Sequence, residues 1–431
     1  MSKPRLIYFN RTLTKLTKSS LTSAADGLPL KKSLKKAERG RRFKALMFVL
    51  PLLAFVSVSF VLPIFDMLFR SVDNPVVSTY LPKTIEKLTL WKGKELPKAE
   101  VFETLAKELL IAKKNRTIGK VAARLNFETS GMRSAINKTV RKIKKYKGTR
   151  YKEALIKFDK RWGETNTWDT IKRIGDRYTG VQYLAALDLK MGPEGKIITQ
   201  PEDRQIYVKI FLRTLWISLV VTLTCLLLAF PVSYLLATLP LRISNILMVM
   251  VLLPFWTSLL VRTTSWIVLL QRNGVVNDII VWLGIIDDGS RIQMVYNQTG
   301  TLVAMTQILL PFMILPLYSV MKTISPSYMK AARSLGASPL RAFARVYVPQ
   351  TVPGIGAGCL LVFILSIGYY ITPALVGGQS GQLISNFIAY HMKSSLNWGL
   401  AAALGTILLF AVLSLYWLYN KIVGIDNMKL G

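Results

Sequence analysis

The sequence predicts an all-α membrane protein with six transmembrane helices and a mostly helical insert outside the membrane. Of its 431 residues 51% are hydrophobic, yet 57 Lys and Arg stand against only 23 Asp and Glu, which gives a formal net charge of +34. Disordered basic proteins lack this apolar content, and soluble globular proteins lack so large an excess of cations. The two properties are compatible when apolar residues lie in membrane spans and cations lie in tails and loops.

Six apolar stretches have about the 20 residues that a helix needs to cross a hydrocarbon core of roughly 30 Å. They are Ala45–Phe65, Ile210–Leu239, Ile243–Val261, Gly300–Met321, Ile355–Val376 and Leu396–Tyr419. The apolar stretch Thr264–Leu270 is too short to span, so we expect it at the membrane interface. The first stretch follows a segment much longer than the start of a signal peptide, and we expect it to remain in the membrane as an anchor.

The distribution of Lys and Arg predicts the orientation of the spans. Residues 1–44 carry 13 of them and form a basic tail that the positive-inside rule keeps in the cytoplasm. Six crossings return residues 425–431 and the loop Lys322–Gln350 to the same side. The five-helix core then covers residues 208–424, and residues 66–207 form an outer insert. Its 30 Lys and Arg against 17 Asp and Glu do not contradict this orientation, because long loops cross membranes largely regardless of charge.

The insert is predicted to be a small helical module. Trp162 and Trp168 indicate a buried surface within it. Apolar residues recur at three- and four-residue spacing at Val101, Leu105, Leu109, Ile111, Ile118, Val121, Leu125, Met132, Ile136, Val140 and Ile143. The passage Thr117–Lys147 is similar to a helix–turn–helix with a basic second helix. Three interpretations stay open for it: a solvated basic bundle, contact with anionic lipid or an acidic partner, and nucleic-acid binding.

Two short helices separated by a glycine are predicted in the loop between the fourth and fifth spans. We expect Ser327 to cap the first helix after Pro326, and the helix to run to Leu335. Gly336 then ends it with a positive φ angle. Two adjacent alanines leave one face of this helix flat, so that another protein can approach closely.

The second short helix is predicted to begin at Ser338 and Pro339, with proline at its first position. Pro349 and Pro353 are expected to stop it before the next span. Its apolar and basic residues fall on different sides, with Leu340, Phe343, Ala344 and Val346 on one and Arg341 and Arg345 on the other.

The spacing within Ser325–Gly354 resembles the EAA loop of binding-protein-dependent ABC importer permeases, and we call this segment the EAA-like loop. In that family the pattern is E-A-A, three residues, Gly, nine residues and I-x-L-P. This chain has Lys330–Ala332, Gly336 and Val346–Pro349 at the same spacing. Lys330 replaces the usual glutamate and reverses its charge, so the usual polar contacts of that position are not expected here.

Three further passages look like the polyamine (spermidine/putrescine) branch of this family. They are Phe211–Ala237, Leu252–Asn277 and Ile371–Gly378. The resemblance covers the first span and nearly all residues from Phe211 onward. It does not cover the insert or most of residues 1–44.

The resemblance implies a MetI-like type I permease in the bacterial inner membrane, with several spans and with both termini in the cytoplasm. The implied partners are a second permease subunit, a periplasmic solute-binding protein and two cytoplasmic ATPase subunits, within a lipid bilayer and without nucleic acid. The first helix of the EAA-like loop is implied to seat in a groove of the ATPase. The residues implied in this contact are Lys330, Ala331, Ala332, Arg333, Leu335, Gly336 and Pro349.

The chain has no G-x-x-x-x-G-K-[ST] phosphate-binding motif, so we expect neither an ATP site nor another cofactor in it. We therefore expect the chain to be no enzyme by itself, and its energy to come from the ATPase partner. A single histidine, His391, argues against His-based zinc or Ser–His chemistry.

If the transported solute is a cationic polyamine, acidic and aromatic side chains in the spans are the candidates for lining its pathway. Acidic side chains are scarce in the spans, and Asp66 lies at the outer end of the first one. Aromatic faces would attract the ammonium groups of a polyamine by about 0.5–2 kcal/mol each. The aromatic candidates are Trp256, Trp266, Tyr369 and Tyr370. The alternative interpretation places them in the ordinary aromatic belt of the bilayer interface.

Other functions stay open as alternatives. The cationic insert suits an amino-acid-derived, opine-like or anionic solute better than a polycation. A membrane-tethered regulator that binds nucleic acid through Thr117–Lys147 would require that segment in the cytoplasm. An ion-driven secondary transporter is disfavoured, because proton or sodium coupling generally needs intramembrane acids.

Overall fold

A computed structural model gives the fold and describes residues 30–93, 95–192 and 196–423. The predicted tail 425–431 and most of the tail 1–44 lie outside these residues. The chain divides into two compact units, Met1–Met67 and Leu68–Gly431.

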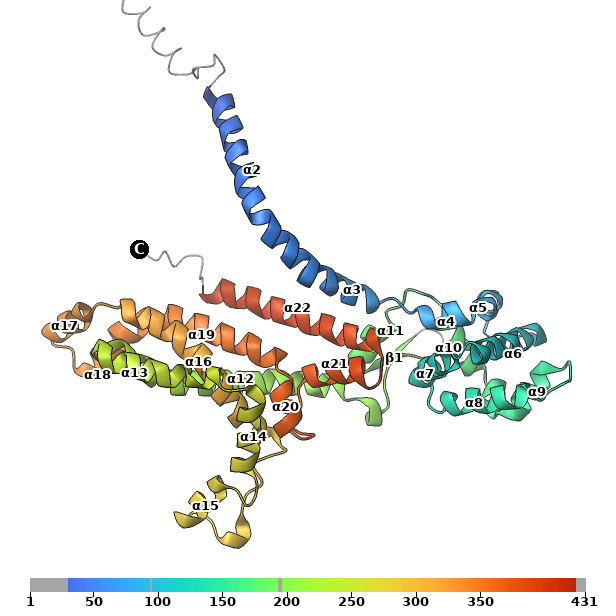
Figure 1. The fold of residues 1–431 in the computed structure, drawn as a ribbon. Helices are drawn as coiled ribbons and strands as arrows, with labels where there is room; N and C mark the ends of the chain where they lie inside the picture. Colours follow the sequence, from blue (N-terminus) through green and yellow to red (C-terminus); the bar gives the residue numbers. More distant parts are fainter. Residues whose placement is uncertain (1–29, 94, 193–195, 424–431) are drawn as a thin grey trace, which may run out of the picture. The chain divides into compact units, whose positions relative to one another are not determined.

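α2 (Leu30–Val56) continues through a π-helical turn at Ser57–Val61 into α3 (Leu62–Arg70), and all of it up to Met67 belongs to the first unit (Figure 1). Residues Arg41–Arg70 of this helix are long and apolar enough to cross a membrane, as predicted for residues 45–65. Pro51 lies inside the helix, as membrane helices allow.

Four long helices form a bundle in the second unit. They are α12 (Tyr207–Thr238), α16 (Gln298–Thr323), α19 (Val348–Gly368) and α22 (Trp398–Val423). The first three pack against one another, and α22 packs against α19 (Figure 1). The shared core of α12, α16 and α19 is apolar and includes Ile217, Val221, Cys225, Met305, Leu309, Met313 and Val362.

The predicted span Ile243–Val261 is not one helix. The chain bends by 96° between Leu241–Trp256, which comprises α13 (Leu241–Leu252) and a short 3₁₀ turn, and Leu259–Trp282. The bend follows Pro254, whose carbonyl accepts both the backbone N–H and the hydroxyl of Thr257 and so ends the helix. Within the described residues, five helices are therefore long and apolar enough to span, or six if this bent pair is one span.

The second arm of the bend contains α14 (Leu259–Leu270) and α15 (Val275–Trp282). The stretch Thr264–Leu270 is part of α14 and not a separate interfacial piece as predicted. Its helix begins upstream because Leu259 and the following residues continue the same apolar run after the turn.

The helix predicted over Ile355–Val376 is also two helices. α19 ends at Gly368, and Tyr369 is extended with ψ of 132°. A new helix, α20 (Ile371–Val376), then carries Pro373 in its first turn, where a missing N–H removes no helical hydrogen bond. α21 (Ile384–Lys393) follows and packs against α22.

The insert is mostly helical, as predicted. Its helices are α4 (Pro75–Tyr80), α5 (Pro82–Thr89), α6 (Ala99–Lys114), α7 (Ile118–Glu128), α8 (Met132–Ile143), α9 (Tyr151–Phe158), α10 (Thr165–Arg173) and α11 (Val181–Ala186). A short antiparallel hairpin of β1 (Leu189–Met191) and β2 (Ile197–Thr199) follows them.

Two tryptophans form the centre of the insert. Trp162 and Trp168 are both fully buried, as predicted. The Trp162 indole donates to the Thr139 hydroxyl at 2.8 Å, and the Trp168 indole donates to the Trp162 carbonyl at 3.0 Å. The predicted apolar positions of α6, α7 and α8 are buried except Ile111, which is 58% exposed because it lies on the outer side of α6.

The insert is joined to the bundle at the start of α12. Asp188, which follows α11 with a φ of +58°, accepts the backbone N–H groups of Ile206, Tyr207 and Val208 at 2.8–3.1 Å. Its carboxylate thus caps a helix that begins far from it in sequence. Beside this cap α11 packs on α22.

A buried polar pair completes the joint. The Tyr207 hydroxyl lies 2.9 Å from His391 Nε2, and Nδ1 of the same ring lies 2.7 Å from the Ser395 hydroxyl. Burial lowers the pKa of His391 to about 4, so the ring is neutral at pH 7.

Candidate functional site: the EAA-like loop and the outer turn

The EAA-like loop begins with α17 (Pro326–Ser334). Ser325, and not Ser327 as predicted, caps this helix, because Pro326 occupies its first position and the Ser325 hydroxyl accepts the Ser327 N–H. Gly336 ends the helix with a φ of +87°, as predicted.

The end of α17 has two characteristic hydrogen bonds. The Ala337 N–H donates to the Ala332 carbonyl at 3.1 Å, and the Gly336 N–H donates to the Arg333 carbonyl at 3.0 Å. These two bonds define a Schellman motif, which fixes the direction in which the chain leaves the helix. Glycine suits its position because a side chain is strained at positive φ.

The second helix of the loop begins as predicted and ends differently. Ser338 caps α18 (Pro339–Ala342), and its hydroxyl accepts the Arg341 N–H. The helix does not stop at Pro349 or Pro353 but continues through a π-helical turn at Phe343–Tyr347 into α19. The wider turn has an i→i+5 bond and accommodates Pro349, which lacks an N–H and would otherwise interrupt a regular helix.

The side chains of this second helix differ in their exposure. Leu340 is 78% exposed, whereas Ala342 and Tyr347 are buried. Phe343 and Tyr347 stack at 5.4 Å, and Tyr234 of α12 meets both rings edge-on at 5.4 and 5.3 Å. These aromatic pairs hold the base of the loop on α12.

The tip of the loop is exposed. α17 has no buried residue, and Tyr328 and Leu335 are 54% and 89% exposed. Lys330 and Arg333 are also exposed. An apolar tip of this kind, on a helix with a fixed base, is a surface suited to binding another protein.

At the other end of the bundle, α20 meets α16 beside the turn at residues 377–381, which we call the outer turn after the side that the sequence predicts for it. The Tyr296 N–H donates to the Val376 carbonyl at 2.7 Å, and the Thr301 hydroxyl donates to the Gly381 carbonyl at 3.1 Å. Gly378 has a φ of +53°, and a Cβ atom there would overlap the Tyr296 carbonyl oxygen. Arg213 of α12 donates to the Gln379 carbonyl at 2.9 Å.

Two of the predicted pathway residues lie next to this turn. The carbonyls of Tyr369 and Tyr370 accept side-chain hydrogen bonds from Ser385 and Asn386 at 2.6 and 2.8 Å. Tyr370 is 39% exposed, and its ring already faces an ammonium group, because Lys393 Nζ lies 5.5 Å from the ring centroid. The contact demonstrates that this ring can accept a cation.

The other predicted pathway residues are not gathered there. Trp266 is partly buried in α14, with its indole 3.4 Å from Gln307 Oε1. Trp256 is 74% exposed in the turn before α14. Asp66 belongs to the first unit, whereas the four aromatic residues belong to the second.

Sequence reasoning missed the contact between α14 and α20. The hydroxyls of Thr263 and Thr372 are 3.5 Å apart, and Arg262 is close enough to Tyr369 to interact with it electrostatically. Arg262 Nε is buried without a hydrogen-bond partner. The only sequence signal was the position of Arg262 beside an apolar run.

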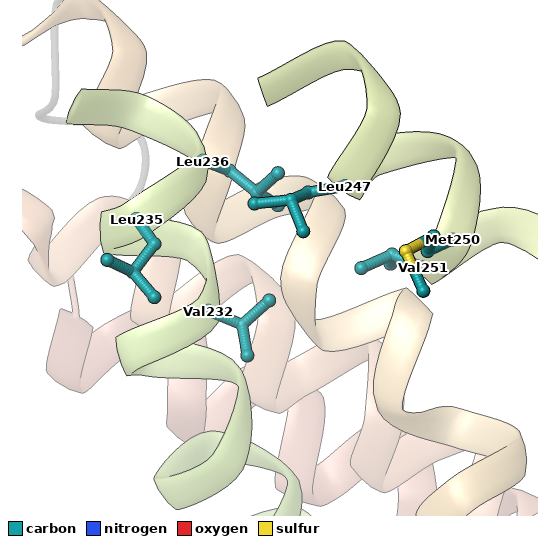
Figure 2. Close-up of a pocket in the computed structure, with 6 residues that line it drawn as sticks. All are labelled: Val232, Leu235, Leu236, Leu247, Met250 and Val251. Carbon is teal, nitrogen blue, oxygen red and sulfur yellow. The ribbon is translucent and has the colours of Figure 1, made fainter. Parts of the chain in front are cut away.

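An apolar pocket opens between α12 and α13. Figure 2 shows the side chains of the two helices that line it: Val232, Leu235, Leu236, Leu247, Met250 and Val251. These six residues offer no polar side chain to orient a charged solute, so we do not assign the transported molecule to this pocket. No three His, Cys, Asp or Glu side chains in the described part of the chain are arranged to hold a metal ion.

Comparison with known proteins gives the family. Residues 214–423 match the family described as "Binding-protein-dependent transport system inner membrane component". The spermidine/putrescine transport system permease protein PotB of Escherichia coli K12 is 35% identical over 222 residues, which cover 51% of this chain and 80% of the relative. PotB of Haemophilus influenzae is 33% identical, with 51% and 77% covered.

Two further similarities are more distant. The inner membrane ABC transporter permease protein YdcU of Escherichia coli K12 is 32% identical over 225 residues, covering 50% of this chain and 71% of the relative. A bacterial ABC transporter that imports the acidic polysaccharide alginate aligns in structure with a TM-score of 0.43 and 19% identity, covering 53% of this chain and 82% of the other. By its match to the family and to PotB of Escherichia coli, the chain belongs to the inner-membrane components of binding-protein-dependent transport systems and is a permease subunit of an ABC importer.

Proposed function

We propose that this permease imports a polyamine of the spermidine or putrescine type, delivered from outside by a solute-binding protein and driven by separate ATPase subunits. The observation that supports a polyamine cargo is the 35% identity to a spermidine/putrescine permease across 80% of that relative. The EAA-like loop is the proposed ATPase contact. The insert and the outer turn are proposed to face the periplasm, with both termini in the cytoplasm.

The geometry supports the ATPase contact at the exposed tip of α17. Tyr328 and Leu335 offer apolar area for a partner groove, and the Schellman motif at Gly336 gives the helix a fixed end. Because the aromatic contacts of Tyr234 join the loop to α12, a displacement of α17 is transmitted to the bundle. Lys330 leaves a positive charge on this surface where the family has a negative one.

The geometry near Tyr370 supports a weakly binding pathway for a cation. Its ring already accepts Lys393, and an arriving ammonium group would exchange with that lysine rather than meet a fixed carboxylate. Weak contacts of about 0.5–2 kcal/mol permit release as well as entry. Selectivity would then reside mainly in the solute-binding protein.

An anionic solute is the second candidate, because the insert carries 30 Lys and Arg against 17 Asp and Glu. Such a surplus would raise the local concentration of an anion and lower that of a free polycation. The two candidates differ in the sign of the cargo charge and are separated by direct uptake.

The test uses vesicles that contain the permease, its partner permease and the ATPase, to which the solute-binding protein of the system is added. We expect ATP-dependent uptake of labelled spermidine, inhibited by putrescine and unaffected by an opine or an organic anion. Lys393→Gln is expected to change the apparent KM several-fold, with Lys421→Gln as a matched control far along α22. Uptake of the anion but not of spermidine would contradict the polyamine assignment while leaving the permease assignment intact.

A further inference from the structure

We propose that the exposed cationic side of α8 and of the turn after it docks an acidic surface of the loaded solute-binding protein. We call this surface the α8 face, and it consists of Arg133, Lys138, Arg141, Lys142, Lys144, Lys145 and Lys147. The inference rests on the proposed function for its orientation and for the charge of the cargo.

The charge of the insert is concentrated on the α8 face. No Asp or Glu occurs between Glu128 and Glu153, whereas this interval holds the seven cations of the face. They are a large part of the surplus of 30 Lys and Arg over 17 Asp and Glu in residues 66–207. A field of one sign over a single helix attracts an oppositely charged partner and increases its association rate.

The cations of the α8 face are free to meet a partner. All seven side chains are exposed. The ion pairs observed in the described part of the insert involve other cations, such as Arg124 with Glu128 at 2.8 Å and Arg150 with Glu153 at 3.9 Å. Lys142 contacts an aromatic ring, Phe158, at 5.4 Å and no carboxylate.

The backbone beneath the α8 face is firmly positioned. Gly131, with a φ of +83°, starts α8, and Asn126 of α7 accepts the N–H groups of Gly131 and Arg133 at 3.0 and 3.2 Å. The opposite side of α8 is buried, with Ile136 and Thr139 both inaccessible. A charged surface on a fixed helix is pre-organised for docking, so little order has to be gained on binding.

The position of the insert favours a partner that arrives from outside. α12 begins beside the insert and ends beside the EAA-like loop, where Lys322 Nζ contacts the Ala237 carbonyl at 3.4 Å. The insert and the loop are therefore at opposite ends of α12. If the ATPase binds the loop in the cytoplasm, the insert meets only outer components.

The chemistry of the cargo indicates an acidic partner. A solute-binding protein that holds a polyamine tightly offsets the ammonium charges with carboxylates, so we expect the surface around its binding site to be acidic. The α8 face would attract that surface and would repel the free polycation. This arrangement favours delivery by the docked complex over entry of unbound cargo.

An anionic lipid surface is the less favoured occupant. Figure 1 shows α8 and α9 away from α11, and α11 packs on the apolar helix α22. The α8 face therefore lies away from the part of the insert that is nearest to the membrane-spanning bundle. Nucleic acid is disfavoured by the same orientation, although α7, the short turn and α8 have the order of a helix–turn–helix.

The experiment measures binding of spermidine-loaded solute-binding protein to the assembled transporter in phosphatidylcholine nanodiscs. The test variant is Lys138→Gln/Arg141→Gln/Lys145→Gln. The control is Lys92→Gln/Lys113→Gln/Lys120→Gln, which removes the same charge from exposed positions elsewhere in the insert. We expect about a tenfold lower association rate for the test variant at low salt, a small change in dissociation, and no difference at 0.5 M NaCl.

Three results would overturn the proposal. Equal slowing in both triple variants would show that net charge, and not the α8 face, matters. Unchanged association in the test variant would remove the face from docking. An effect seen only with phosphatidylglycerol nanodiscs would assign the face to lipid. In all three cases the wild type still binds the solute-binding protein and hydrolyses ATP in response; loss of that response in the wild type would instead contradict the proposed function.

Discussion

The two ends of the helix bundle are built differently. At the EAA-like loop, α17 buries no side chain, and Leu335 and Leu340 are 89% and 78% exposed. At the other end, Asp188 caps α12 with three hydrogen bonds, and Tyr207 and His391 form a buried pair. One end exposes apolar groups, whereas the other pairs polar groups within the chain.

The difference is clearest at two glycines with positive φ. Around Gly336 an added Cβ would meet no atom within 4 Å, whereas around Gly378 it would overlap the Tyr296 backbone. Gly336 is therefore needed for the direction of the chain alone, and Gly378 for direction and for close packing. Substitutions at the first should affect coupling, and substitutions at the second should affect stability.

The largest expected effect is on transport by Gly336→Val. A β-branched residue is strained at a φ of +87°, so the Schellman motif should rearrange and α17 should leave its docking orientation. We expect uptake to fall to background and less ATPase to co-purify, while the protein still inserts. Gly336→Asn is the matched control, because asparagine tolerates this conformation. Normal uptake by the valine variant would contradict the coupling role.

Gly378→Ala should have the largest effect on stability. Its methyl group would overlap a backbone carbonyl that cannot move aside as a side chain can, at an expected cost of about 3 kcal/mol. The thermal midpoint in detergent measures this loss. Gly289→Ala, where the added atom meets nothing within 4 Å, should leave the midpoint unchanged.

The buried pair of Tyr207 and His391 predicts a dependence of stability on pH. The pKa of His391 is about 4 in the folded state and about 6.5 when unfolded, so the unfolded chain binds a proton first as the pH falls. The neutral His391 ring contributes to the free energy of unfolding above pH 6.5. This contribution is lost as the pH falls toward 4, by roughly 2 kcal/mol between pH 7 and pH 5. Unfolding of wild type and His391→Gln at several pH values should show a shallower loss in the variant, and equal slopes would argue against the neutral ring.

Asp188→Asn should have the smallest effect of this series, about 1 kcal/mol. Asparagine keeps the φ of +58° and one acceptor oxygen but removes the charge at the start of α12. The thermal midpoint should fall by a few degrees, and Asp188→Ala should lower it further. A larger loss in the asparagine variant than in the alanine variant would contradict the capping role.

Local rules predicted the EAA-like loop well. Gly336 and the Ser338–Pro339 start depend on neighbouring residues only, and both are confirmed. Ser325 was also predictable, because proline prefers the first helical position and Pro326 then leaves Ser325 as the cap. The continuation past Pro349 was not, because the π-helical turn is stabilised by Tyr234, which is distant in sequence.

Contacts between distant segments also explain the other differences. The apolar run over Ile355–Val376 hides the break at Tyr369, where Ser385 and Asn386 bind the freed carbonyls. The cap from Asp188 and the pairing of Lys393 with Tyr370 have no local signature in the sequence. Length and hydropathy therefore predicted how many spans there are better than where their helices break.

The most direct test of the central claim is the sidedness of the two ends. Leu335→Cys and Lys145→Cys are placed one at a time in a Cys225→Ala/Cys359→Ala background and exposed to a membrane-impermeant maleimide. We predict labelling of the first only in inside-out vesicles, with protection by bound ATPase, and of the second only in right-side-out vesicles. Labelling of both positions from the same side would contradict the account.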